Sequence, residues 1–186
     1  MVLKSERIII GIDPGTNILG YGIVLCSGNK MSLIEMDVLK LGNHTNHALK
    51  LKSIFEELSL IIDKHHPDEL AIEAPFFGKN VQSMLKLGRT QGVAMAVGLS
   101  KGIPIFEYSP KKIKQSITGK GNASKEQVAS MLLRILNIKE MPKYLDATDG
   151  LAAAVCHYFQ KDKPEQGDSY SGWKSFVTKN PRRTIS

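Results

Sequence analysis

Four acidic side chains stand where strongly apolar segments begin or end. Asp13 follows the apolar run at residues 8–12, and Glu73 follows the run at residues 70–72. Asp146 and Asp149 precede the apolar segment 150–155, and their spacing places both on one face of a helix. Carboxylates rarely lie beside buried segments unless something pairs with them. The sequence therefore predicts that these acids share a partner.

The expected partner is Mg²⁺, with Mn²⁺ as a substitute. Four converging carboxylates without a cation would repel one another and raise each other's pKa values. Hard divalent cations prefer oxygen ligands. Two such ions about 3.5–4 Å apart would suit phosphodiester hydrolysis, one activating a water and the other stabilising the leaving 3′ oxygen. Asp13, Glu73, Asp146 and Asp149 are accordingly predicted to be metal ligands and catalytic residues.

Each acid taken alone also has a purely structural interpretation. Asp13 would support the turn at Pro14 and Gly15, and Glu73 would be a charge at the edge of a sheet. Asp146 would be a helix N-cap, and Asp149 would interact with the helix dipole. The convergence of all four acids is what favours the metal site.

The elements that must position these acids follow an α/β pattern. Strands are predicted at about residues 7–12, 19–25, 31–40, 69–73 and 103–108, the first three as an antiparallel meander. Helices are predicted at about residues 47–66, 79–100 and 110–117, from residue 124 onward, and at 145–160. This order predicts one domain at residues 1–160, with a mixed five-stranded sheet flanked by helices. Residues 161–186 are predicted to form a basic, flexible tail.

Basic residues gather in the middle of the chain. The chain has a formal net charge of +7, and residues 76–125 hold nine Lys or Arg residues with Glu107 as the single acid. Neighbouring parallel strands that end in acids would place both acids at one edge of the sheet. A basic block beside such an edge suits a protein that holds nucleic acid next to a metal site. An ordinary solvated surface is the alternative.

Composition excludes several other classes of protein. Hydrophobic residues make up 42% and charged residues 23% of the chain, as in ordinary globular domains. The sequence has no apolar run of about 20 residues and no secretory h-region, so no membrane association is expected. Two cysteines, Cys26 and Cys156, exclude a disulfide scaffold and fit a cytoplasmic protein.

Four motifs, in order, resemble those of the RuvC family of Holliday junction resolvases. Its opening motif is matched by Gly11-Ile-Asp13-Pro-Gly-Thr16 and Gly20-Tyr-Gly22. Its second motif is matched by Ala71-Ile-Glu73-Ala-Pro-Phe76-Phe-Gly-Lys79-Asn80, continued by Leu85-Lys-Leu-Gly88-Arg89. Its basic region is matched by Phe106-Glu-Tyr108, Lys114-Gln115, Gly119 and Lys125, and its closing acidic motif by Asp146-Ala-Thr-Asp149-Gly-Leu-Ala152. The resemblance covers residues 7–160.

The resemblance implies a ribonuclease H-like fold and a structure-specific endonuclease. Such an enzyme would resolve four-way junction DNA by paired, symmetric, Mg²⁺-dependent nicking during recombination and repair. The resemblance implies metal-binding and catalytic roles for the four acids, and DNA contacts for Phe76, Lys79, Arg89, Lys114 and Lys125. Lys114 and Lys125 would contact phosphates near the cut, and Phe76 would stack on a base. A homodimer and a branch-migration motor of RuvA-type and RuvB-type subunits are implied as partners.

The symmetry of the expected substrate gives an independent reason for a dimer. A two-fold dimer presents two identical sites to two strands of like polarity in a four-way junction. The small-residue helix at 79–100 is the predicted interface, with packing against the sheet as the equal alternative. Three other functions remain open: a non-catalytic DNA-binding module, a single-domain relative of the actin and Hsp70 phosphate-binding superfamily, and a ribonuclease that cuts RNA–DNA hybrids.

Overall fold

Five strands form one mixed sheet in the computed structural model, which describes residues 6–44, 46–75, 80–140 and 142–161. The strands are β1 (Glu6–Asp13), β2 (Ile18–Ser27), β3 (Lys30–Lys40), β4 (Glu69–Glu73) and β5 (Ile105–Tyr108). Their order in the sheet is β3-β2-β1-β4-β5. The first three strands pair antiparallel, whereas β1, β4 and β5 run parallel. The predicted meander and mixed five-stranded sheet are confirmed.

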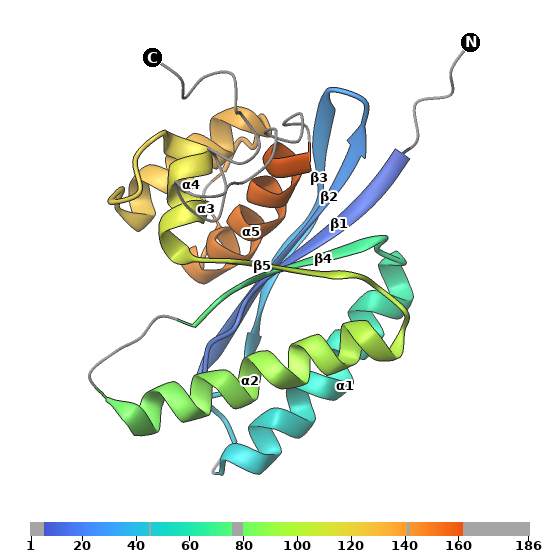
Figure 1. Ribbon diagram of the computed structural model, residues 1–186, viewed down its shortest axis with the longest axis vertical. Helices are drawn as coiled ribbons and strands as arrows, with labels where there is room; N and C mark the ends of the chain where they lie inside the picture. The colour runs from blue at the N-terminus through green and yellow to red at the C-terminus, as the bar shows by residue number, and fades with distance from the viewer. Residues whose placement is uncertain (1–5, 45, 76–79, 141, 162–186) are drawn as a thin grey trace, which may run out of the picture.

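Helices cover both faces of this sheet (Figure 1). They are α1 (His47–His65), α2 (Val81–Ser100), α3 (Pro110–Thr118), α4 (Lys125–Ile135) and α5 (Leu145–Lys161). One face is covered by α1 and α2, and the other by α3, α4 and α5. Neighbouring residues of β1 serve opposite layers, since Ile9 packs in the α5 layer and Ile10 in the α1–α2 layer. In the part of the chain described, no helix combines the length and apolar character needed to cross a bilayer.

Local sequence signals explain where the helices begin. The side chains of Asn46, Asn80 and Ser109 cap α1, α2 and α3 by accepting a hydrogen bond from a first-turn N–H group. Pro110 occupies the first turn of α3, and Ser124 with Gln127 forms a complete capping box at α4. Because α1, α2 and α3 follow β3, β4 and β5 respectively, their N-termini lie at the same edge of the sheet.

Glycines allow α5 to approach the sheet closely. A Cβ atom built on Gly20 would lie 1.8 Å from the Asp146 carbonyl oxygen, and one on Gly22 would lie 2.5 Å from the Leu151 Cα atom. On the helix side, a Cβ atom at Gly150 would lie 2.5 Å from the Gly20 carbonyl oxygen. The backbones of β2 and α5 are therefore in contact, which fixes the height of the first turn of α5 above the sheet.

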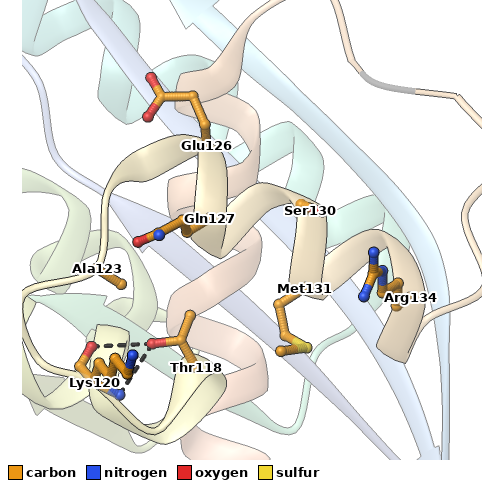
Figure 2. Close-up of a pocket in the computed structure, with 8 residues that line it drawn as sticks. All are labelled: Thr118, Lys120, Ala123, Glu126, Gln127, Ser130, Met131 and Arg134. Carbon is orange, nitrogen blue, oxygen red and sulfur yellow. Dashed lines mark hydrogen bonds between the residues drawn. The ribbon is translucent and has the colours of Figure 1, made fainter.

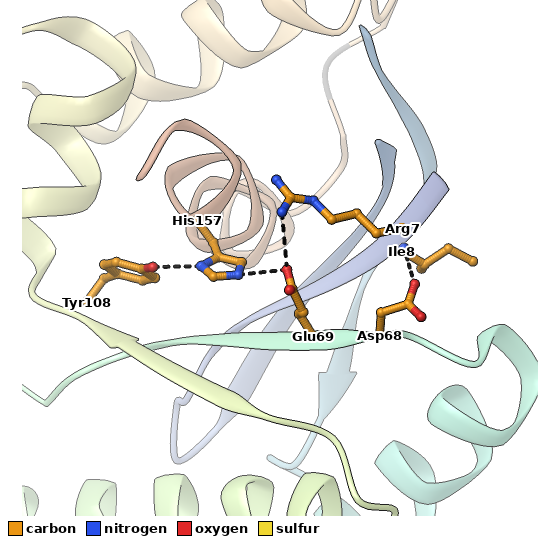
Figure 3. Close-up of polar contacts among 6 residues, drawn as sticks. All are labelled: Arg7, Ile8, Asp68, Glu69, Tyr108 and His157. Atoms are coloured by element: carbon orange, nitrogen blue, oxygen red, sulfur yellow. Dashed lines mark hydrogen bonds and ion pairs between the residues drawn. The ribbon is translucent and has the colours of Figure 1, made fainter. Parts of the chain in front are cut away.

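A buried polar chain joins the other end of α5 to β4 and β5 (Figure 3). His157 Nε2 lies 2.9 Å from Glu69 Oε2, and His157 Nδ1 lies 2.6 Å from the Tyr108 hydroxyl oxygen. Burial, followed by the positive charge of Arg7, lowers the pKa of His157 to about 4. The neutral ring therefore donates from Nε2 to Glu69 and accepts from Tyr108 at Nδ1. These two hydrogen bonds of His157 hold α5 in register with β4.

We predict that Gly22→Ala destabilises the protein by about 2 kcal/mol, because the added methyl group would force α5 away from β2. Urea unfolding followed by circular dichroism would measure the loss. The matched control is Gly42→Ala, since a Cβ atom at Gly42 meets nothing within 4 Å. Equal midpoints for the two variants would contradict the close contact.

Candidate active site

Asp13 and Glu73 lie side by side at the carboxyl ends of two neighbouring parallel strands. The β1–β4 ladder pairs Ile12 with Ile72, and each acid is the next residue of its strand. Strand β4 is short and buried except at its end, so Glu73 leaves the sheet where the apolar sequence stops. The expectation that both acids share one edge of the sheet is confirmed.

The first turns of α5 bring two further acids to the same place. Asp146 and Asp149 lie three residues apart on one face of the helix, whose backbone contacts Gly20. One carboxylate oxygen each from Asp13, Asp146 and Asp149 lies within 4.8 Å of the others. Glu73 is outside this trio, although its pKa responds to the charges of Asp13 and Asp149. Asp13 is thus the residue that connects Glu73 to the two acids of α5.

A pocket of about 150 Å³ contains this arrangement. Two lysines from different helices, Lys114 of α3 and Lys125 of α4, line it together with three of the acids. The complete lining is Asp13, Glu73, Pro110, Ile113, Lys114, Lys125, Val128, Asp149 and Ala152. The pocket is therefore acidic at the sheet edge, basic on the side of α3 and α4, and apolar where the helices meet.

Lys125 is bound directly to the acids. Its ammonium group donates a hydrogen bond to Asp149 Oδ2 and lies 3.8 Å from Asp146 Oδ1. Burial lowers the pKa of Lys125, but the hydrogen bond and negative charge of Asp149 outweigh this, and the net shift is upward. The single positive charge of Lys125 leaves most of the negative charge of the cluster uncompensated.

Burial, and after it the uncompensated negative charge, raise the pKa values of the acids. Burial, followed by the charges of Asp13 and Asp149, raises the pKa of Glu73 to about 8. Burial, and then the charge of Asp149, raise the pKa of Asp13 to about 6. Burial also raises the pKa of Asp149, although Lys125 opposes the shift. A cluster of oxygen donors that holds protons near neutral pH is one that a hard divalent cation fits.

The remaining predicted DNA contacts do not all lie at this pocket. Arg89 lies on the exposed side of α2. Burial lowers the pKa of His47 in α1, and the positive charges of Arg89, Lys86 and Lys50 contribute to this shift. Phe76 and Lys79 lie outside the described residues. The DNA-binding roles of these residues stay predictions.

Three apolar residues of the pocket were not anticipated from the sequence. Ile113, Val128 and Ala152 come from α3, α4 and α5 and separate the charged groups from the core. The only signal for them is the buried stripe of each helix, which marks core residues in general. The direct pairing of Lys125 with Asp149 was also missed, because the two residues lie in different helices and are 24 positions apart in the chain.

A larger pocket of about 420 Å³ lies on the outer side of α4 (Figure 2). Lys120, Arg134 and Met131 line it together with Glu126 as its single acid. The Thr118 hydroxyl donates to the Lys120 carbonyl oxygen and accepts from the Lys120 N–H group, which fixes one wall. Because Glu126 is its single acid, this pocket lacks the converging carboxylates of the first one.

Comparisons with known proteins point to one family. The family model described as "Crossover junction endodeoxyribonuclease RuvC" matches residues 9–157. Two proteins of that name are similar to this chain: one from Christiangramia forsetii is 64% identical over 182 residues, with 98% of this chain and 95% of that protein covered. The other, from Bacteroides fragilis, is 59% identical over 181 residues, with 96% of each chain covered.

A solved structure agrees with these matches. "T. thermophilus RuvC in complex with Holliday junction substrate" superposes with a TM-score of 0.77 and 31% identity, covering 83% of this chain and 94% of that chain. The predicted ribonuclease H-like fold class is confirmed by this likeness and by the mixed sheet with its flanking helices.

We predict that Glu73→Gln raises the melting temperature of the metal-free protein by several degrees at pH 9 and leaves it unchanged at pH 4. The folded-state pKa of Glu73, about 8, lies above its ordinary value of 4.5, so the folded state binds the proton more tightly than the unfolded chain does. The stabilisation from this proton is complete below pH 4.5 and is lost as the pH rises through 8. Removing the charge avoids a loss on the order of 2 kcal/mol.

Thermal unfolding in EDTA across this pH range would measure the effect. Glu56→Gln on the exposed surface of α1 is the matched control and should change little at either pH. A Glu73→Gln variant that is less stable than wild type at pH 9 would show that this acid supports the fold.

Proposed function

We propose that this chain, which belongs to the RuvC family of crossover junction endodeoxyribonucleases, cuts four-way DNA junctions at the pocket formed by Asp13, Glu73 and Asp149. Membership of the family follows from the match over residues 9–157 and the identity of 64% to a family member. The chain is accordingly a junction-resolving endonuclease. One observation supports the location of the site: the acids converge in a pocket that also contains Lys114 and Lys125.

We propose two cation positions that share Asp13. Asp13, Asp146 and Asp149 have oxygens close enough to hold one cation. Glu73 lines the same pocket as Asp13 and is the proposed further ligand of the second. We propose that these positions take Mg²⁺, for which Mn²⁺ would substitute. When bound, such ions supply a polarised water for in-line attack and stabilisation of the negative charge on the leaving 3′ oxygen.

The lysines would hold the DNA strand against the acids. Lys114 lines the pocket from α3 and lowers the pKa of both Glu73 and Asp149, so its positive charge is directed at the cluster. Lys125 is bound to Asp149 and faces the same pocket. We propose that each lysine contacts a phosphate next to the cut, which offsets the repulsion between the strand and the carboxylates. Lys125 would also keep Asp149 in one orientation.

The exposed side of α2 supports the proposed homodimer. Small and apolar residues form one stripe along this helix: Val81, Leu85, Gly88, Gly92, Ala96 and Leu99. Val81, Leu85 and Leu99 are 65%, 51% and 63% exposed, and Cβ atoms at Gly88 and Gly92 would meet nothing within 4 Å. Gly98, by contrast, packs on Leu70 of the sheet. Among the described residues, no other element packs on this stripe, and a second copy with the same stripe would allow two backbones to approach closely.

Further partners are proposed on the family resemblance. We propose that the dimer works beside a branch-migration motor of RuvA-type and RuvB-type subunits, in the cytoplasm where the chromosome lies. The roles of Phe76 in base stacking and of Lys79 and Arg89 in phosphate contacts belong to the same proposal.

We predict that Asp13→Asn abolishes cleavage, by at least about a thousandfold, and leaves junction binding equal or tighter, because it removes a cation ligand and a negative charge near the phosphates. A four-way junction labelled on each strand in turn, incubated with Mg²⁺ or with EDTA, would measure cleavage, and gel shift in EDTA would measure binding. Wild type should nick two strands of like polarity at symmetric positions.

Asp63→Asn is the matched control, since Asp63 lies on the exposed surface of α1 and pairs with Lys101. If Asp13→Asn loses binding together with cleavage, the acids hold the fold and the proposal is wrong. A wild type that binds but never cuts would favour the non-catalytic module. Preference for an RNA–DNA hybrid over the junction would favour the ribonuclease.

We predict that Gly92→Glu converts the dimer to a monomer without unfolding it, because the added side chain points into open space on the isolated chain but would be buried and charged at the interface. Sedimentation velocity would give the mass, and circular dichroism the fold. Gln82→Glu, on the exposed surface of the same helix beside the stripe, should remain dimeric. A dimeric Gly92→Glu variant would place the interface elsewhere.

A further inference from the structure

An aromatic ring lies between two lysines at the entrance to α5. The Tyr144 ring centroid is 4.9 Å from Lys40 Nζ and 5.6 Å from Lys143 Nζ. Lys40 is the last residue of β3, and Tyr144 immediately precedes α5, so two segments distant in sequence meet here. Among the described residues, neither lysine has a carboxylate within 4 Å, although two like charges repel each other. This arrangement favours an anionic ligand.

The strand register places this group beside the acidic pocket. Asp13 pairs with Gly20, and Gly20 pairs with Val38. Lys40 therefore lies two strands away from Asp13 and two residues further along the strand direction, beyond the carboxyl end of β1. At about 4.8 Å per strand and 3.3 Å per residue, the separation of the two Cα atoms is about 12 Å. A single DNA strand covers such a distance with about two nucleotides. Tyr144 is also only two residues from Asp146 in the chain.

The group lies across the pocket from the basic helices. In the sheet order β3-β2-β1-β4-β5, Lys40 is on one side of β1, and β5, which leads into α3, is on the other. Lys114 and Lys125 therefore line the pocket from one side, while Lys40, Lys143 and Tyr144 flank it on the other. A DNA strand that enters the pocket beside Lys114 and Lys125 and passes over the acids would leave the pocket past Lys40, Lys143 and Tyr144.

We propose that Lys40, Lys143 and Tyr144 form a stacking platform that holds one nucleotide of the DNA strand about two nucleotides from the cut, and this rests on the proposed function. The base stacks on the tyrosine ring, and the lysines, which are exposed, move to the flanking phosphates. The exchange is favourable, because stacking a base on an aromatic ring stabilises more than an exposed cation–π contact does.

The test uses four-way junctions with 2-aminopurine at each of the four nucleotides on either side of the cut, bound in EDTA. Stacking on tyrosine quenches 2-aminopurine fluorescence, so wild type should quench one of these positions. Tyr144→Phe should keep the quenching, and Tyr144→Ala should lose it and weaken binding about tenfold. Lys40→Ala should lower the slope of log K against log salt by about one.

Lys30→Ala is the matched control, because Lys30 is an exposed lysine at the opposite end of the same strand. If Tyr144→Ala keeps the quenching and affinity of the wild type, the stacking platform is wrong. An unchanged salt slope in Lys40→Ala also contradicts it, even if the enzyme cuts junctions normally. Because binding is measured without a divalent cation, a wild type that never cleaves overturns the proposed function and still tests the platform. Melting temperatures close to wild type confirm that the variants are folded.

Discussion

The contact between the backbones of α5 and β2 is the constraint on which the candidate site depends. Gly20, Gly22 and Gly150 bring the helix so near the sheet that the Asp146 carbonyl group occupies the space of a missing Cβ atom. A helix separated from the sheet by ordinary side chains would lie about 10 Å away, and the carboxylates of Asp146 and Asp149 would not reach Asp13. The buried chain from Tyr108 through His157 to Glu69 fixes the other end of the same helix. Together these contacts gather acids from three elements around one pocket.

Placing those acids together has an electrostatic cost that the chain itself offsets only in part. Burial and mutual repulsion raise the pKa values of Asp13 to about 6 and of Glu73 to about 8, and Lys125 is the one cation with a direct ion pair to the cluster among the described residues. A structure optimised for stability alone would replace such acids with neutral residues. Their presence is therefore best explained by a ligand that is itself a cation, which the proposed function requires.

The parts of this site that follow local rules could be predicted from the sequence. The convergence of Asp13 and Glu73 followed from two apolar strands that end in acids, and the shared face of Asp146 and Asp149 followed from helical spacing. The pairing of Lys125 with Asp149 and the position of Tyr144 between Lys40 and Lys143 depend on how distant segments meet. The sequence also left open whether the glycines of α2 faced the sheet or a partner. Gly98 faces the sheet, whereas Gly88 and Gly92 face open space.

The helix termini extend the electrostatic pattern beyond the pocket. The first turns of α1, α2 and α3 contain no acid, although acids are favourable there, and all three helices begin at the edge where Asp13 and Glu73 lie. Their unmatched positive dipoles, together with the lysines on either side of α5, would attract a phosphate backbone along the whole edge. Only at α5 does the first turn carry an acid of the cluster. Under the proposed function, this edge would attract a DNA strand on both sides of the carboxylates. The proposed divalent cation would then join the acids and the phosphate at the one place where the edge is negative.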